Sequence, residues 1–459
     1  MASQTARHFI GLRLSVMMFL QYAIWGAWLP LLYPYLLGHC GFKLDQVGMI
    51  LAAGAVGAIF GPFIAGQVAD RYFDTGKFLA VSHILGAVLV WVLASAQSFG
   101  VFLGLSLLYG LVYAPTLALT NSLCFHHLTD RDKQFGPIRL WGTIGWIVAG
   151  IAMGHWLLVK YTPEGTDAFI KAAQDLGRAD AFRLSAILGL IMGIYCLTLP
   201  HTPPTKNARE ANATLEAIKE VRRQPLLMLF VLAIPISVIH QFYFVHTSEF
   251  LSELQRQSAA AQSTAVWINN ILGVGGGGLM TIGQMSEIAV LALMPLVAKQ
   301  VSRKALLALG ICAYAARMAL FAYAAQSMPA VLLGVTLHGF CFGCFIFVAF
   351  MVVDEQTRAD VRASAQNLFN LVIVGIGIIV GSWFATSIVG NWATHDVLNE
   401  AGQPILNEAG EVITRMNYTE LFSVPMWASL ACLLVLIVFY PRGKRKSVGG
   451  ESATDAHRH

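Results

Sequence analysis

Charge is what this sequence has least of. Charged side chains make up 12% of the 459 residues, whereas an ordinary soluble domain carries roughly 25%. Hydrophobic residues make up 56%, the mean hydropathy is +0.64, and long apolar runs recur from residue 12 to residue 440. These proportions exclude a soluble enzyme and predict an all-α polytopic protein that crosses the lipid bilayer many times.

Several patterns that carry chemistry are also missing. The 7 cysteines are odd in number and lie mostly in apolar runs, so they indicate no disulfide framework. The sequence has no HExxH pair and no phosphate loop with a lysine. Gly273-x-Gly275-x-x-Gly278 lies in an apolar run with no strand before it, so close helix packing or a hinge explains it better than dinucleotide binding. We therefore expect no enzyme, no cofactor, no metal and no nucleic-acid partner.

The apolar runs predict twelve transmembrane helices, because a helix needs about 20 mostly apolar residues to span a bilayer. The first run is too long for the apolar region of a cleavable signal peptide. The expected spans are 12–37, 45–69, 77–96, 99–127, 136–159, 182–200, 225–250, 265–298, 304–325, 328–353, 362–389 and 420–440.

Lys and Arg are unevenly distributed between these spans. Most of the 30 basic residues fall in segments on the same side as the N-terminus, among them 201–224 and the tail that begins at Arg442. Basic residues mark the cytoplasmic side of a membrane protein. Both termini are therefore predicted to be cytoplasmic.

The segment 201–224 divides the chain into two halves of six helices. We predict an N-terminal bundle over 1–200, a cytoplasmic linker over 201–224, a C-terminal bundle over 225–441 and a disordered cytoplasmic tail over 442–459. The outside loops 160–181 and 390–419 occupy equivalent places in the two halves, which indicates an internal duplication. The second loop contains a tandem repeat, 398–405 and 406–413, which we interpret as a hairpin-like decoration.

An ionisable side chain in the middle of a span is a functional candidate, because inserting it costs roughly 2.5–3.5 kcal/mol. Glu287 is the acid that lies well inside a predicted span. Gln284 precedes it by three residues and shares its helix face. The alternative is structural: Glu287 locked to a neighbouring Arg, and Gln284 bonded between helices.

Arg139 begins a second candidate group. Arg139, Thr143 and Trp146 follow at i, i+4 and i+7, so a donor, a hydroxyl and an aromatic face line one helical stripe. Such a stripe suits a polar solute that carries a ring, and an interfacial Arg with packing aromatics is the alternative. Arg317 lies deep in the span 304–325 without companions on its own helix, and we interpret it as structural.

Other polar side chains within spans are weaker candidates. A lone histidine on an apolar helix is more often a hydrogen-bonded structural residue than a proton carrier. These residues are His240, Gln241, His246 and Glu249 in the span 225–250, and His338 with Phe342 in the span 328–353.

Two sets of motifs resemble known families. Gly66-Gln-Val-Ala-Asp70-Arg71, between the second and third spans, resembles the GxxxDR signature of the major facilitator superfamily. Segments spread almost end to end resemble the bacterial nucleoside:proton symporters. They include Phe19-Leu-Gln21, Trp25-Gly26, Pro137-Ile-Arg139, Trp141-Gly-Thr143-Ile-Gly145, Ser286-Glu287 and Arg362-Ala-Ser-Ala-Gln366. The resemblance implies the 6+6 pseudo-symmetric major facilitator fold and a place in a bacterial inner membrane.

The resemblance also implies a nucleoside site between the two halves. The positions that match the family's pocket are Arg139, Thr143, Gln241, Gln284, Glu287 and Phe342. Four positions depart from the family pattern: Trp146 replaces a Phe, His338 a Tyr, Phe244 an Asn, and Gly343 an Asp that is associated with substrate binding and coupling.

The functional hypothesis is a monomeric symporter that works by alternating access, with a nucleoside, a proton and the lipid bilayer as its partners. Glu287 would be the protonation site, loaded by the proton gradient. If Arg139 holds Glu287 ionised, simple facilitation is the alternative. The departures at Phe244 and Gly343 favour a further alternative, another polar solute such as a modified nucleoside or a sugar. A non-transporting sensor on the same fold is a third reading.

Overall fold

The computed structural model describes residues 2–64, 74–203, 218–259, 263–358, 361–406, 410 and 412–441. Within this part of the chain, 12 helices are long and apolar enough to cross a membrane. The predicted fold class, an all-α protein with twelve transmembrane helices, is confirmed. The motif residues Gly66, Asp70 and Arg71, most of the linker and the tail 442–459 lie outside the described residues.

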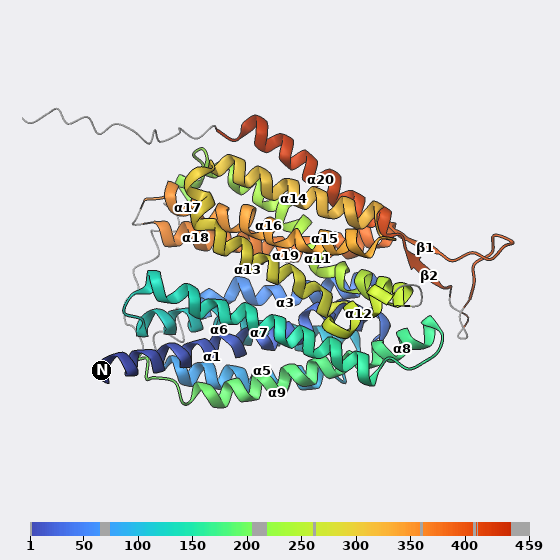
Figure 1. The fold of residues 1–459 in the computed structure, drawn as a ribbon, viewed down its shortest axis with the longest axis horizontal. Coiled ribbons are helices and arrows are strands. Elements are labelled where there is room, and N and C mark those ends of the chain that lie inside the picture. The colour runs from blue at the N-terminus through green and yellow to red at the C-terminus, as the bar shows by residue number, and fades with distance from the viewer. Residues whose placement is uncertain are drawn as a thin grey trace, which may run out of the picture.

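The long helices run side by side in two groups, blue to green below and yellow to red above in Figure 1. The lower group consists of α1 (Ala2–Trp28), η1 (Leu29–Leu31), α2 (Leu32–Gly38), α3 (Leu44–Ile64), α5 (Thr75–Leu93), α6 (Phe99–His127), α7 (Arg131–Lys160), α8 (Asp167–Gly177) and α9 (Ala179–Cys196).

The upper group begins with the longest helix and ends with a short sheet and a final helix. It consists of α11 (Leu226–Ala259), α12 (Ser263–Leu272), α13 (Gly277–Gln300), α14 (Arg303–Tyr323), α15 (Met328–Thr336), α16 (His338–Phe340), the π-helix η3 (Cys341–Phe347), α17 (Val348–Gln356), α18 (Arg362–Asn370), the π-helix η4 (Leu371–Ile376), α19 (Gly377–Trp383), the π-helix η5 (Phe384–Gly390), β1 (Thr394–Asp396), β2 (Thr414–Met416) and α20 (Tyr418–Phe439).

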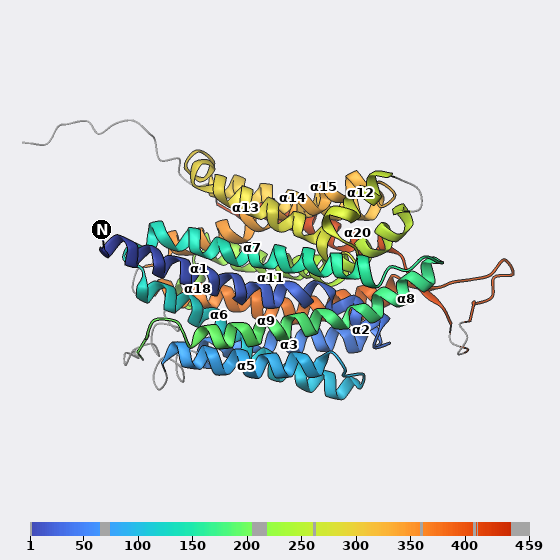
Figure 2. The ribbon, with the colours of Figure 1, turned by 60° about the horizontal axis from the view of Figure 1, so that its bottom comes forward.

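The strands β1 and β2, with α8 and α12, lie at the end of the bundle opposite the N-terminus (Figure 1, Figure 2). We call this the hairpin end. Several helices begin at a polar cap, where a side chain accepts a hydrogen bond from an otherwise unpaired backbone amide. Asp130 caps α7 by accepting from the Lys133 amide at 3.2 Å, and Ser302 caps α14 by accepting from the Ala305 amide at 3.2 Å.

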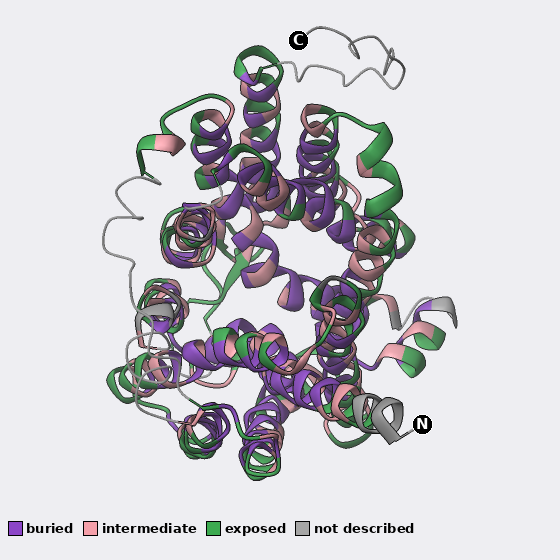
Figure 3. Ribbon diagram, turned by 90° about the vertical axis from the view of Figure 1, so that its left-hand side faces the viewer, coloured by how far each residue is buried: buried purple, intermediate pink, exposed green. Residues whose placement is uncertain are grey.

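Each group of helices has its own apolar core. One core is built almost wholly from residues 14–199, and the other from residues 226–440. An end-on view separates the two groups, with the N-terminus in the lower one (Figure 3). Val245 of α11 and Val274, which follows α12, pack into the core of the first half. The two halves therefore share buried apolar contact at these two positions.

Glycines set how closely helices approach in the first half. A Cβ added at Gly26 of α1 would lie 2.6 Å from the Cα of Trp146 on α7, and one at Gly145 would meet the backbone of Phe19. Small residues at such positions let two helix backbones come into direct contact in a membrane. This contact fixes the rotation of α7, and with it the direction of the stripe that begins at Arg139.

Two expectations about helix boundaries were wrong. The segment 160–181 is not a loop, because α8 occupies 167–177 and leads directly into α9. The sequence of α8 is charged and amphipathic, so a search for apolar runs does not find this helix. The run 265–298 is not one helix, because it breaks between α12 and α13.

The break between α12 and α13 coincides with a cluster of glycines. Gly273, Gly275 and Gly276 have φ values of 75, 83 and 81°, a region that residues with a side chain adopt only with strain. A Cβ at Gly154 of α7 would lie 3.2 Å from the Cα of Gly273. The prediction of a hinge or close packing at these glycines is confirmed.

The tandem repeat extends a small hairpin. β1 pairs antiparallel with β2, and each repeat closes on itself through a bridge at equivalent positions, Leu398 to Pro404 and Leu406 to Val412. Three backbone hydrogen bonds form a closed cycle at the ends of the repeats. The amide of Val397 donates to the carbonyl of Ile413, the amide of Ile413 to that of Ile405, and the amide of Ile405 to that of Val397, each at 2.8 Å. The prediction of a hairpin-like structure is confirmed.

Candidate functional site

The stripe on α7 faces α13 of the other half. A Cβ at Gly150 of α7 would lie 3.0 Å from Cγ2 of Thr281 on α13. Arg139, Thr143 and Trp146 share the helix face of Gly150, because positions 4, 7 and 11 residues apart lie above one another on a helix. The structure therefore places the polar part of this stripe at the boundary between the two halves.

On α13, Gln284 continues the face of Thr281, and Glu287 lies one turn further along the helix. Gln284 is buried, and its Oε1 has no hydrogen-bond partner among the described residues. The side chain of Glu287 is 16% exposed, and Arg139 of the first half interacts with it electrostatically. A carboxylate and an unpartnered amide oxygen thus stand opposite a guanidinium across the boundary.

His338 of α16 lies beside Glu287 in the second half. Its Nε2 lies 3.7 Å from Oε2 of Glu287. Glycines bring the two helices together: Gly339 leaves no room for a side chain against Ser286, and a Cβ at Gly343 would lie 2.6 Å from Cγ1 of Val290. Close packing of α13 against α16 and η3 therefore accounts for both the contact of His338 with Glu287 and the glycine at 343.

Arg139 has an aromatic partner that the sequence did not single out. Its guanidinium carbon lies 3.9 Å from the centre of the Tyr22 ring on α1. Stacking on an aromatic face stabilises a cation and holds its plane in one direction. The Tyr22 ring thus orients Arg139 towards the boundary. No signal in the sequence links these two positions, which are far apart in the chain.

Three further positions of the family's pocket, of which Gln241 and Phe342 match the family and Phe244 departs from it, make different contacts. Gln241 of α11 is buried and donates to the Ser382 hydroxyl at 3.0 Å, so it bonds a helix of its own half. Phe244 stands edge-on to His338 with ring centroids 5.8 Å apart. Phe342 is partly buried and packs on the second core.

Arg317 contacts a histidine and a tyrosine that other helices contribute. Its Nη1 lies 3.2 Å from Nδ1 of His338, and its guanidinium lies over the Tyr243 ring at 4.4 Å. The expectation concerned companions on α14 itself, whereas these partners come from α16 and α11 and cannot be seen in the pattern of α14 alone.

The other weak candidates have structural partners. His240 bonds the Tyr314 hydroxyl at 2.6 Å through Nδ1, and His246 contacts the Ala385 carbonyl at 2.9 Å through Nε2. Among the residues that the structure describes, no group of three or more His, Cys, Asp and Glu side chains is arranged to hold a metal ion.

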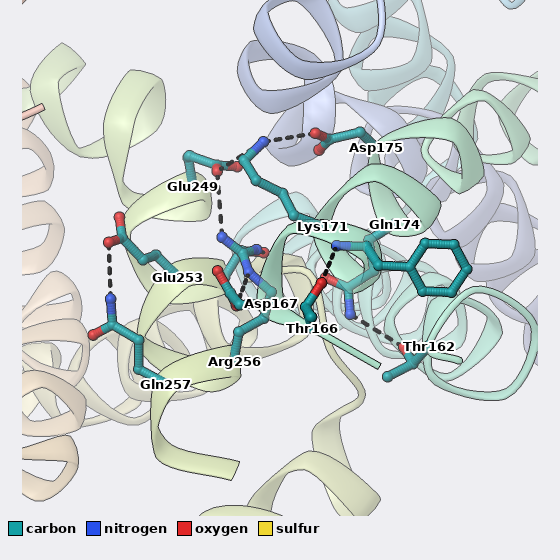
Figure 4. A network of polar contacts seen from close by, with 12 residues as sticks. Thr162, Thr166, Asp167, Lys171, Gln174, Asp175, Glu249, Glu253, Arg256 and Gln257 are labelled. Atoms are coloured by element: carbon teal, nitrogen blue, oxygen red, sulfur yellow. Dashed lines mark hydrogen bonds and ion pairs between the residues drawn. The ribbon is translucent and has the colours of Figure 1, made fainter. Parts of the chain in front are cut away.

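Glu249 belongs to a separate ion-pair network at the hairpin end, drawn in part in Figure 4. It lies 3.2 Å from Nη2 of Arg178 and 3.6 Å from Nζ of Lys171. Arg178 is fully buried and also pairs with Asp175. Since α8 and the residue after it belong to the first half and α11 to the second, these contacts tie the halves together at this end.

The comparisons with known proteins agree with one another. The family described as Nucleoside H+ symporter matches residues 9–445. YegT of Escherichia coli K12, described as a candidate nucleoside transporter, is 31% identical over 80% of this chain and 82% of its own. The xanthosine permease of the same organism is 28% identical over 84% of this chain and 91% of its own.

Solved structures give the same fold. The crystal structure of the nucleoside transporter NupG superposes with a TM-score of 0.76 and 22% identity, over 93% of this chain and 98% of that chain. The sequence of nucleoside permease NupG of Escherichia coli K12 is 27% identical over 90% of this chain and 96% of its own.

Proposed function

The chain belongs to the nucleoside H+ symporter family, and we propose that it imports nucleosides with protons by alternating access, through a site between its two halves. It is an integral multi-pass membrane transporter and not an enzyme. The observation that carries the proposal is Glu287, a mid-helix carboxylate at the boundary between the halves, with Arg139 opposite and His338 beside it.

The side chains at the boundary suit a nucleoside. Arg139 and Gln284 offer a charged donor and an unpartnered acceptor for ribose hydroxyls and base edges. Trp146, Phe244 and Phe342 offer aromatic faces on which a base stacks. Glu287 takes up the coupling proton, because a mid-membrane carboxylate is easily converted between its charged and neutral forms by a change of surroundings.

Alternating access requires the halves to separate at one end of the bundle at a time. In this structure, polar contacts join the halves at the hairpin end: Arg178 with Glu249, Arg256 with Asp167 at 3.1 Å, and Val274 with Gly154 at 3.0 Å. We assign the hairpin end to the outside and both termini to the cytoplasm of a bacterial inner membrane. The state described is then closed to the outside.

The test is uptake of radiolabelled uridine and adenosine into proteoliposomes, with and without an inward proton gradient. Accumulation stimulated by the gradient supports symport, and uptake that only equilibrates favours a facilitator. Glu287→Gln is expected to abolish the stimulation while exchange of internal for external nucleoside continues. Glu253→Gln, on α11 outside the site, is the matched control. Unchanged accumulation by Glu287→Gln would show that Glu287 is not the coupling residue.

A second candidate is another polar solute on the same fold, such as a modified nucleoside or a sugar. Gln241 donates from Nε2 to Ser382 within its own half, and Phe244 presents an apolar ring to His338. One polar group of the family's pocket is therefore partly engaged, and the position of Phe244 offers no polar group to a solute. Competition of uridine uptake by a panel of nucleosides and sugars separates the two candidates. Stronger competition by a sugar than by any nucleoside would favour the second.

A further inference from the structure

The buried guanidinium of Arg317 reaches the site through an imidazole ring. Arg317 lies on α14 with its side chain fully buried, and its Nη1 is 3.2 Å from Nδ1 of His338. The other ring nitrogen of His338, Nε2, is 3.7 Å from Oε2 of Glu287. His338 therefore stands between Arg317 and Glu287, with one ring nitrogen directed at each.

The chemistry of the guanidinium selects one form of this ring. Arginine carries five N–H donors and no acceptor, and it keeps its charge in proteins. Nδ1 of His338 can therefore take part only as an acceptor, so it carries no proton. The single proton of the neutral ring is then on Nε2, and that N–H is directed at the carboxylate of Glu287.

Aromatic rings hold both partners in this geometry. The guanidinium of Arg317 lies over the rings of Tyr243 at 4.4 Å and Tyr314 at 5.1 Å. The ring of His338 stacks on Tyr243, with centroids 4.7 Å apart and an interplanar angle of 18°. A buried, stacked imidazole cannot rotate its other nitrogen towards Arg317 without displacing its neighbours.

The other titratable groups that face this chain of contacts come from α7, α11 and η3. His240 of α11 stacks on His338 with centroids 5.6 Å apart, while its own Nδ1 is bonded to the Tyr314 hydroxyl. Arg139 of α7 acts on Glu287, and Cys341 of η3 interacts electrostatically with Arg317. The hydrogen-bond partner of Nδ1 of His338 is Arg317.

We propose that Arg317 is a positioning residue of the transport site, which holds His338 as a neutral Nε2–H donor and so leaves Glu287 as the group that takes up the coupling proton. This inference rests on the proposed function. A proton added at Nδ1 would face the guanidinium and displace its hydrogen bond, so the charge of Arg317 opposes ionisation of His338. The N–H on Nε2 is directed at the carboxyl group of Glu287, whose Oε2 lies 3.7 Å from Nε2.

The first test needs no transport and no variant at position 317. Spectra of 15N-labelled histidine distinguish the two ring nitrogens, and His338→Gln identifies the signals of His338 among the 13 histidines. For the wild-type protein in detergent we expect an unprotonated Nδ1 and a protonated Nε2 from about pH 8 down to about pH 5, where an ordinary histidine would ionise. A proton on Nδ1 within this range overturns the inference.

The second test is the pH dependence of gradient-driven uridine uptake. The wild type is expected to titrate as one group. Arg317→Gln frees His338 to ionise, so its uptake should titrate as two groups, and the added group should disappear in the double variant with His338→Gln. Arg317→Lys keeps a cation beside Nδ1 and is expected to restore the one-group profile. A one-group profile for Arg317→Gln overturns the inference.

Tyr314→Phe is the matched control, because it removes a buried hydroxyl from the same cluster and leaves the contact of Arg317 with His338 in place. It should keep the one-group profile, and an added group that disappears when His338→Gln is also present would overturn the inference. If Arg317→Gln does not fold, the wild-type spectra still decide. If the wild type shows no proton-stimulated uridine uptake, the proposed function fails, and the spectra test the form of His338 independently.

Discussion

Gly154 of α7 and Gly273, in the break between α12 and α13, lie against each other with no side chain between them. A Cβ on Gly154 would lie 3.2 Å from the Cα of Gly273, and the amide of the next residue, Val274, donates to the Gly154 carbonyl at 3.0 Å. The two halves of the transporter thus meet backbone to backbone at the hairpin end, one glycine from each. Such a contact can be made and broken without rearranging side chains.

Gly273→Ala is expected to destabilise the protein more than the same change at Gly402. Both glycines have positive φ, 75° and 73°, so each alanine pays about 1 kcal/mol of backbone strain. Gly402 has nothing within 4 Å, whereas a Cβ at Gly273 meets the backbone of Gly154 and His155, which adds about 1–3 kcal/mol. Thermal unfolding in detergent measures the difference. Equal losses of stability would contradict the role of this contact.

Glu249→Gln should loosen the hairpin end. The variant removes one of the two carboxylates that pair with the buried guanidinium of Arg178, the other being Asp175, and breaking a buried ion pair costs up to about 3–5 kcal/mol. Because the pair joins the two halves, part of this cost favours the state that is open at the hairpin end. The reporter is Val274→Cys in a cysteine-free background, since Val274 is buried in the core of the opposite half. Labelling by an impermeant maleimide should become faster by several-fold.

Glu253→Gln is the control for this experiment. Glu253 lies one turn further along α11 and pairs with Arg415 at 2.6 Å, within the second half. That hydrogen bond raises the pKa of Arg415 above its ordinary value, but it does not cross the boundary. Labelling of Val274→Cys should keep the wild-type rate in this background. Equal acceleration by both variants would argue against a gate at Glu249.

Gly343→Asp, which introduces the residue that the resemblance associates with this position, should harm the protein unless Val290 is made smaller. The added Cβ would lie 2.6 Å from Cγ1 of Val290, and overpacking of this kind costs about 1–3 kcal/mol. Separating the helices would also draw His338 away from Glu287. The melting temperature and uridine uptake should both fall, and both should recover when Val290→Ala is added. A stable, active Gly343→Asp single variant would contradict this packing.

Tyr22→Leu should weaken nucleoside binding, whereas Tyr22→Phe should not. The ring lies 3.9 Å from the guanidinium of Arg139, and a cation held over an aromatic face is stabilised by about 1 kcal/mol. Losing it would raise KM about fivefold, because 1.4 kcal/mol corresponds to a factor of about ten. Phenylalanine keeps the face and should keep KM. Initial rates of uptake give the measurement, and an effect as large from Tyr22→Phe would point to the hydroxyl.

Part of the site could be predicted from the sequence because its cause is local. A carboxylate in the middle of an apolar helix is costly wherever the helix packs, which singles out Glu287. The spacing of Arg139, Thr143 and Trp146 places them on one face by helix geometry alone. Neither inference needs to know which helix lies opposite.

The partners of these residues could not be predicted in the same way. Arg317 bonds His338 and Arg139 stacks on Tyr22, and both contacts join helices whose relative rotation no periodicity encodes. The helix α8 was missed for a different reason, since its face is charged and its partners lie on other helices, among them α2 and α11. Its stability comes from tertiary contacts, whereas an apolar run is recognised from its own composition.

Local sequence is enough to predict that this protein crosses the membrane with twelve helices, since insertion depends on local apolar length and on where Lys and Arg fall. It also determined which mid-membrane groups are costly enough to need a function. Which partners these groups have depends instead on how the helices pack against one another. Glycine contacts at positions such as 26, 145, 339 and 343 set the distance and rotation of each helix, and a hydrogen bond or ion pair forms only where that geometry brings donor and acceptor within reach.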